Sequence, residues 1–416
     1  MSGSFQLVWE ALHPDADQFG GVLVDSTAGH GFLFYPGDVR RTGVLMWQKN
    51  KVHSAAEVQC IRYRVDEIVW SRSLGADLDV SRSYSHELRQ ILQIRPLMLV
   101  QSAVVLAICI GAEQWRVVAL SKEDGALLWS TDCVEPAVEA GIESADLFVA
   151  VRSDGTVDLL RMSSGKVISS LLRVADGASI QTGSAGVAIV DDTGILHFFA
   201  PDGKKRFQLQ LTLGELDSAE NRVRVRVDDV LLCDAGRLRS LSAQDGQVRW
   251  TVPTVGLGQV ALFETRSYVI VQALSPPGVM VHRADTGAVI ESPVFGQMRH
   301  WVEDNGDIVG PDRSGNVVVV DGAVGLVKQT LTAEELTVFE VAVSDDGRMF
   351  ATAVRTQDDP LILLEFDLVT GGVLRQTELP APGTFHLDAP TSRSVIVSSG
   401  VGVAVYDAGP DDRAQK

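Results

Sequence analysis

The sequence is poor in cysteine, in aromatic residues and in basic residues. Aromatic side chains make up only 6% of the chain, and lysine and arginine total 36 against 54 acidic residues, which gives a net charge of −18. A protein that grips nucleic acid needs a basic surface to neutralise phosphates. Nucleic acid is therefore not an expected partner. The four scattered cysteines form no CxxC pair, which favours a reducing compartment: Cys60, Cys109, Cys133 and Cys233.

The pattern of a secretory signal is also missing, because no basic segment followed by an apolar core stands at the N-terminus. The most hydrophobic stretch is Pro96–Gly111. Its 16 residues fall short of the roughly 18–20 that a membrane-spanning helix needs. Gln101 and Ser102 interrupt it where a turn would fall, so two buried strands are the better interpretation. We expect a cytoplasmic protein with no membrane association.

The sequence contains none of the motifs GxxxxGK[ST], HExxH or GxSxG. His13-x-Asp15-x-Asp17 could be drawn as a metal site, but its polar surroundings favour a solvated loop. The acidic loop at 303–307 lacks the spacing of a calcium-binding loop. Lys204 to Arg206 are three bases at a turn, which favours a solvated hairpin tip. We therefore predict no catalytic residue, no metal and no cofactor.

The stretch Trp115–Thr131 has the pattern of a β-hairpin. The apolar run at 117–120 is followed by the turn residues Asp124 and Gly125, and a second run ends at Trp129. Aspartate tolerates left-handed backbone geometry, and glycine takes a positive φ without a steric cost. An apolar run, a turn that ends in glycine and another apolar run indicate a β-hairpin.

This hairpin recurs along the chain. Its turn glycine stands at positions 125, 165, 203, 246, 287, 325, 371 and 409, which are 38 to 46 residues apart. Phe207 and Trp250 follow their glycines by four residues, as Trp129 does, whereas Glu291 takes that place after Gly287. The period contains strand patterns and no helical pattern. About 40 residues with four strands is the blade of a β-propeller.

The residues that carry the hairpin resemble a known family. Ala119-x-Ser121-x-x-Asp124-Gly125-x-x-x-Trp129 is similar to the docking motif of PQQ-like repeats, which build quinoprotein-type propellers and are related in form to WD40-like repeats. The resemblance implies that the aromatic residue of each motif packs against the next blade. On this basis we assign structural blade turns and docking to Gly125, Trp129, Gly165, Gly203, Phe207, Gly246, Trp250, Gly287 and Gly371.

The repeats predict an all-β propeller of four-stranded antiparallel blades over residues 97–408, with eight blades favoured over seven. The last repeat lacks a fourth strand, and residues 5–10 resemble such a strand, so we expect residues 1–12 to complete this blade, with Trp9 closing the ring. Residues 11–96 fit the period poorly and are either an irregular blade or, as we favour, an accessory β-rich insert with a short helix at Ser83–Ile94. Residues 409–416 are expected to be a disordered tail.

The fold and the missing motifs favour a non-enzymatic protein-binding scaffold. By analogy with bacterial propellers of this kind, it would be a subunit of a multi-protein complex, such as a conflict or phage-defence system with an AAA+ ATPase and a von Willebrand A protein. Two alternatives come from the family resemblance. One is an oxidoreductase with PQQ and calcium in the central funnel, and the other is an envelope assembly scaffold.

Overall fold

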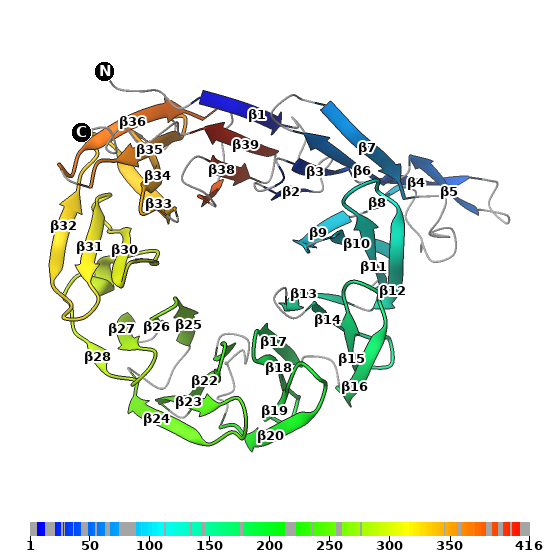
Figure 1. The fold of residues 1–416 in the computed structure, drawn as a ribbon, viewed down its shortest axis with the longest axis horizontal. Coiled ribbons are helices and arrows are strands. Elements are labelled where there is room, and N and C mark those ends of the chain that lie inside the picture. The colour runs from blue at the N-terminus through cyan, green and yellow to red at the C-terminus, as the bar shows by residue number, and fades with distance from the viewer. Residues whose placement is uncertain are drawn as a thin grey trace.

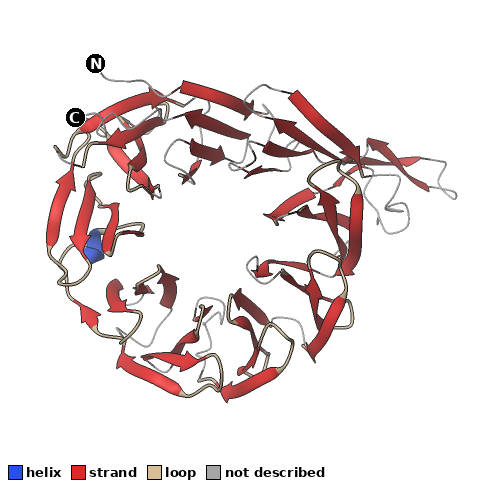
Figure 2. Cartoon of the chain, viewed as in Figure 1, coloured by secondary structure: helices blue, strands red, loops and turns tan. Residues whose placement is uncertain are grey.

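The computed structural model is a ring of small antiparallel β-sheets, with the two chain termini on the same part of the ring (Figure 1). The structure describes residues 6–12, 21–25, 28, 30–35, 37–42, 49–54, 56–62, 67–74, 89–92, 94–100, 102–111, 114–133, 135–142, 146–174, 178–212, 222–234, 236–254, 260–274, 277–344, 346–356, 359–368, 370–379, 385–389, 394–399 and 402–407. Within them the chain forms β-strands and one 3-10 turn at Phe295–Gln297, and no α-helix (Figure 2).

Nine of the sheets have four strands, and we number these blades in the order of the chain. Blade 1 contains β2 (Gly21–Asp25), β3 (His30–Tyr35), β6 (Glu57–Arg62) and β7 (Glu67–Ser73). Blade 2 contains β9 (Ile94–Leu99), β10 (Ala103–Gly111), β11 (Gln114–Ser121) and β12 (Leu127–Cys133). Blade 3 contains β13 (Glu135–Ile142), β14 (Leu147–Val151), β15 (Thr156–Arg161) and β16 (Val167–Arg173).

The next three blades follow the same plan. Blade 4 contains β17 (Ser179–Gly183), β18 (Gly186–Val190), β19 (Ile195–Phe199) and β20 (Lys205–Gln210). Blade 5 contains β21 (Val223–Val225), β22 (Asp229–Asp234), β23 (Arg237–Ser242) and β24 (Val248–Pro253). Blade 6 contains β25 (Val260–Glu264), β26 (Tyr268–Leu274), β27 (Pro277–Arg283) and the short β28 (Val289–Ile290).

The last three blades bring the chain back to its start. Blade 7 contains β29 (Val302–Asp304), β30 (Asp307–Pro311), β31 (Val317–Asp321) and β32 (Val327–Leu331). Blade 8 contains β33 (Thr337–Val343), β34 (Met349–Val354), β35 (Ile362–Phe366) and β36 (Val373–Glu378). Blade 9 contains β37 (Phe385–Asp388), β38 (Ser394–Ser399), β39 (Gly402–Asp407) and, as its outermost strand, the N-terminal β1 (Gln6–Leu12), which pairs with β39.

The blade count corrects the sequence-based expectation of eight, with seven as the alternative. The additional blade is blade 1, which lies in the region expected to be an insert. An irregular blade was the less favoured alternative for this region, because the outer hairpin between β6 and β7 has no turn glycine: the connecting residues 63–66 are Tyr-Arg-Val-Asp. Its two middle strands, β3 and β6, are also separated in the sequence by other strands, so no local period marks them.

The region 37–92 also supplies a three-stranded sheet of β4 (Gly37–Thr42), β5 (Lys49–Ser54) and β8 (Arg89–Leu92), in the order β5-β4-β8. It projects from the outer side of the ring beside blades 1 and 2 (Figure 1). The short helix expected at Ser83–Ile94 is wrong over residues 89–92, which pair with β4 as a strand. The remainder of that expected helix up to residue 88 lies outside the described residues.

The hydrophobic core is divided into clusters that lie between neighbouring blades. One cluster joins Phe32 and Trp70 of blade 1 to Leu106 of blade 2, and a second joins Trp129 of blade 2 to Phe148 of blade 3. Six further clusters continue around the ring to the junction of blades 8 and 9. Because the middle strands are covered on both faces, they are continuous apolar runs. The stretch Pro96–Gly111 accordingly contains part of β9 and all of β10, and these two strands pair with each other.

Candidate functional site

The turn glycines lie between the third and fourth strands of their blades, in left-handed backbone geometry. Their φ angles are +69° at Gly125, +63° at Gly165 and +72° at Gly246, and the other described members of the series are similar: Gly203, Gly287, Gly325 and Gly371. The last turn glycine, at 409, lies outside the described residues. Left-handed geometry costs an L side chain roughly 1–2 kcal/mol, which explains glycine at this position.

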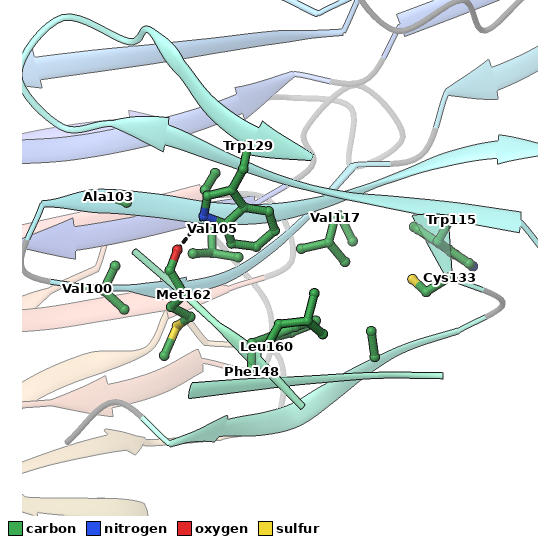
Figure 3. Close-up of a cluster of buried hydrophobic side chains, with 13 residues drawn as sticks. Val100, Ala103, Val105, Trp115, Val117, Trp129, Cys133, Phe148, Leu160 and Met162 are labelled. Atoms are coloured by element: carbon green, nitrogen blue, oxygen red, sulfur yellow. Dashed lines mark hydrogen bonds between the residues drawn. The ribbon is translucent and has the colours of Figure 1, made fainter. Parts of the chain in front are cut away.

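Each turn glycine also lies against a side chain of the preceding blade. Trp129 of blade 2 covers Gly165 of blade 3, where an added Cβ would lie 2.7 Å from the indole Cγ. The indole Nε1–H donates a hydrogen bond to the carbonyl oxygen of Met162, in the same turn (Figure 3). The ring is buried with Phe148 and Leu160 of the next blade. Trp129 therefore joins two blades by both packing and a hydrogen bond.

The same rule places the other predicted residues. The side chain four residues after one turn glycine faces the turn glycine of the next blade: Trp129 faces Gly165, Ser169 faces Gly203, Phe207 faces Gly246, Trp250 faces Gly287 and Gln329 faces Gly371. At Gly325 the nearest atom of the preceding blade is the carbonyl oxygen of Glu291. Trp250 donates to the carbonyl oxygen of Ala284 at 3.2 Å. Six of the nine predicted residues thus lie against one another in three pairs, whereas Gly125, Gly203 and Gly371 face residues that were not predicted.

A β-bulge directs these side chains toward the next blade. In blade 2, Trp129 pairs with Ala119 and Leu127 pairs with Leu120, so Leu128 is an additional residue in the outer strand. Equivalent register shifts occur in every other blade except blade 6, where β28 is too short to contain one. A bulge bends a strand and re-aims the next side chain. The residue four places after the glycine is therefore aimed at the neighbouring blade.

Sequence reasoning missed the first member of the series, Trp70. Its ring faces Gly125, and its Nε1–H donates to the carbonyl oxygen of Lys122 at 2.9 Å. The signal in the sequence was an Ile-Val-Trp run like the Leu-Leu-Trp run before Ser130. Trp9, the predicted closing residue, has its Cα opposite that of Val405 in β39, and its side chain lies outside the described residues.

Blade 8 carries a charged group at the equivalent position. Arg375 stands four residues after Gly371 and is buried, with its Nε 3.0 Å from Glu365. Arg348 is also buried and makes two hydrogen bonds of 2.9 Å to the same carboxylate. Removing one partner from a buried ion pair leaves an uncompensated charge and costs about 3–5 kcal/mol. We therefore interpret this group as structural.

One pocket lies between blades 5 and 6 and has a volume of about 340 Å³. Its walls are the β21–β22, β25–β26 and β27–β28 connections, together with residues of β22, β23, β24 and β27. Four arginines line it, namely Arg226, Arg249, Arg266 and Arg283, together with three aspartates and Trp250. An excess of guanidinium groups is unusual on a chain whose net charge is −18.

The four arginines differ in their partners. Arg283 pairs with Asp285 at 3.2 Å, whereas the Nε of Arg226 lies 3.6 Å from Asp229 and 3.9 Å from Glu264. Burial raises the pKa of Glu264, and the nearby arginines oppose that rise. Within the described part of the chain, the guanidinium groups of Arg249 and Arg266 have no ion-pair or hydrogen-bond partner.

Sequence reasoning also missed this pocket, although one signal pointed to it. Residues 222–227 alternate arginine and valine, as Arg-Val-Arg-Val-Arg-Val. Val223 and Val225 are buried in the cluster between blades 4 and 5. Alternate residues of a strand point to opposite faces, so the arginines lie away from that cluster. The remaining pocket arginines come from blades 5 and 6 and gather only through the fold.

The acidic loop considered for calcium has protein partners instead. Glu303 accepts hydrogen bonds from the backbone N–H and hydroxyl of Ser267, at 2.7 and 2.5 Å, and Asp307 lies 2.7 Å from Lys328. In the described ranges no three His, Cys, Asp or Glu side chains gather where a metal could bind. His13, Asp15 and Asp17 lie outside those ranges. No helix formed by the described residues is long and apolar enough to cross a membrane.

Comparisons with known proteins give one family match and several structural likenesses. The profile of the family described as outer membrane protein assembly factor BamB matches residues 54–257. BamB from Moraxella catarrhalis is 12% identical, over 97% of this chain and 99% of that chain, with a TM-score of 0.45. The C-terminal WD40 domain of Sif2 is 9% identical, over 99% of this chain and all of that one, with a TM-score of 0.48.

The computationally designed protein Ika8 is 16% identical, over 76% of this chain and 96% of that chain, with a TM-score of 0.48. No curated protein sequence matches the chain. The matched profile runs from the third strand of blade 1 to the connection after blade 5, and the four-stranded blades continue in the same form beyond it. The chain is a β-propeller, and over residues 54–257 it matches a family of PQQ-like propellers.

Proposed function

We propose that this propeller is a non-enzymatic scaffold for protein–protein interaction. The observation that supports it is the arginine-lined pocket, which is formed by connections of two blades that are themselves packed together through Leu231 and Leu262. Walls held by such packing change little on binding, and a preorganised site loses less entropy when a partner associates.

The cellular setting is part of the proposal. Cys60, Cys133 and Cys233 are buried free thiols, and burial raises the pKa of Cys60 to about 11. Unpaired thiols fit a reducing compartment, so we place the scaffold in the cytoplasm. We further propose, by analogy of fold alone, that it is a subunit of a multi-protein complex, such as a bacterial defence system with an AAA+ ATPase and a von Willebrand A protein.

Two other functions remain as alternatives from the sequence. An envelope assembly scaffold is favoured by one observation, the description of the matching family. An oxidoreductase with PQQ would need calcium ligands, and the residues that the structure describes do not bring three such side chains together. We therefore derive no reaction for this chain.

The test is purification of the tagged protein from its native host, followed by quantitative mass spectrometry and reconstitution of the complex from separately purified components. We expect one partner at a near-equal molar ratio that co-elutes in size-exclusion chromatography. Cell fractionation in the same experiment separates a cytoplasmic scaffold from an envelope scaffold. Elution of the protein alone with a bound chromophore would show that the scaffold proposal is wrong and support the oxidoreductase.

A further inference from the structure

We propose that the pocket between blades 5 and 6 binds carboxylate groups presented by an acidic segment of a protein partner. The inference rests on the proposed scaffold function and names the chemistry that the partner must carry. The pocket combines an excess of arginine, an unsatisfied nitrogen in its wall and a neighbouring carboxylate that its lining already holds.

The pocket has unpaired positive charge. Its four guanidinium groups face three carboxylates, and the pairs that form are Arg283 with Asp285 and, more loosely, Arg226 with Asp229. The guanidinium groups of Arg249 and Arg266 form no ion pair or hydrogen bond with the described residues, although Arg249 is close enough to Asp245 to add to the hydrogen bonds that lower the pKa of that carboxyl. Arginine presents a planar fork of donors that matches a carboxylate. Two such forks, one from β24 and one from the β25–β26 connection, can each receive one carboxylate.

The wall of the pocket also contains an unsatisfied donor. The Nη2 of Arg226 donates to the carbonyl oxygen of Arg266 at 3.1 Å, but its Nη1 is buried with no hydrogen-bond partner. A buried donor without a partner costs about 1–3 kcal/mol. An anion that reaches this nitrogen would remove the cost, so Arg226 is the further pocket residue that we expect to contact the ligand.

Carboxylates already bind to this part of the fold. The backbone N–H and the hydroxyl of Ser267, a residue that lines the pocket, hold the Glu303 carboxylate of blade 7. The lining of the pocket thus already hydrogen-bonds a carboxylate, which favours aspartate or glutamate side chains as the ligand groups.

The ligand is a protein segment because the pocket offers apolar contacts beside its charges. Val227 is 72% exposed, and Trp250 forms part of the wall. A free dicarboxylate would use only the guanidinium groups. A segment that alternates acidic and aliphatic residues can use both, because aliphatic side chains can lie on Val227 and Trp250 while the acids reach the arginines.

The experiment uses the full chain and a fluorescein-labelled peptide of alternating Glu and Val, with binding measured by fluorescence anisotropy. The matched peptide has Gln in place of Glu. The test variants are Arg249→Glu and Arg266→Glu. The control variant is Arg206→Glu, because Arg206 is exposed and follows Gly203 by three residues, as Arg249 follows Gly246, but lies outside the pocket. Circular dichroism and thermal melting verify that the variants fold.

We expect the Glu peptide to bind and the Gln peptide to bind at least about tenfold more weakly, since each charge-assisted hydrogen bond is worth about 1.5–3 kcal/mol. Each pocket variant should weaken binding about tenfold, while the Arg206 variant binds like the wild type. Equal affinity for both peptides, or equal loss in the Arg206 variant, would overturn the inference. So would displacement experiments in which inorganic phosphate binds and the Glu peptide does not.

The outcomes also separate this inference from the scaffold proposal. A reconstituted partner that binds the two pocket variants with unchanged affinity would overturn the pocket's role and leave the scaffold intact. Failure to find any stoichiometric partner would instead contradict the scaffold, whatever the peptide does.

Discussion

Replacing Trp129 by alanine tests how the blades are held together. The side chain is 7% exposed, covers Gly165 and donates a hydrogen bond to Met162. Truncating a buried tryptophan costs about 3–5 kcal/mol, and that figure includes the Met162 carbonyl left without its donor. Trp129→Phe keeps most of the packing and loses the donor, so it should cost about 1–2 kcal/mol.

The natural control lies one junction further along the ring. Ser169 occupies the same repeat position against Gly203, but it has little volume to lose. Ser169→Ala should therefore cost less than about 1 kcal/mol. The difference between the two losses of stability is the contribution of the aromatic ring, because both residues occupy the same position in the repeat.

The assay is thermal unfolding combined with hydrogen exchange. Unfolding entropy is about 2.1 cal/mol/K per residue, so a loss of about 4 kcal/mol over 416 residues lowers the midpoint by about 4–5 °C when the ring unfolds as one unit. Exchange should accelerate first in β12, β15 and β16, the strands on the two sides of the junction. The reasoning is refuted if Trp129→Ala and Ser169→Ala shift the midpoint by the same small amount.

Three further predictions concern the turns, the ring closure and pH. Gly165→Ala should lower the free energy of unfolding by more than about 2 kcal/mol, because alanine is strained in left-handed geometry and its Cβ would clash with the indole of Trp129. Gly372→Ala should be nearly neutral in urea unfolding, because the nearest neighbouring atom would lie 3.8 Å from the added Cβ. Deleting residues 1–12 removes the strand β1 that pairs with β39 and exposes a sheet edge. The melting temperature of the whole ring should therefore fall, and an unchanged melting curve would contradict the closure. Burial opposes ionisation of Asp191, but hydrogen bonds, with that to His197 the largest, hold its pKa at about 2. Because the pKa is lowered on folding, the ionised Asp191 stabilises the fold fully above the ordinary pKa of 3.8. This stabilisation is lost as the pH falls through about 2. Asp191→Asn should therefore cost about 2 kcal/mol at pH 7, and its urea midpoint should converge with that of the wild type in acid.

Local signals in the sequence predicted the structure of single blades but not the number of blades in the ring. Hairpins such as Trp115–Thr131 combine an apolar run, a turn glycine and a second run, and these features depend only on residues close together in the chain. The pairing of β1 with β39 was visible because residues 5–10 resemble an outer strand. Blade 1 was hidden because its outer hairpin lacks a turn glycine and its strands β3 and β6 pair across an inserted segment.

By itself, the sequence determined that the chain would form four-stranded blades on a period near 40 residues, because turn chemistry and strand patterns are local. Only the tertiary structure decided that there are nine blades, that a bulge aims Trp129 at Gly165, and that four arginines line one pocket. Those features depend on which strands lie side by side. Arg249 and Arg266 are 17 positions apart in the sequence and belong to different blades, and only the packing of blade 5 on blade 6 brings them to the same cavity.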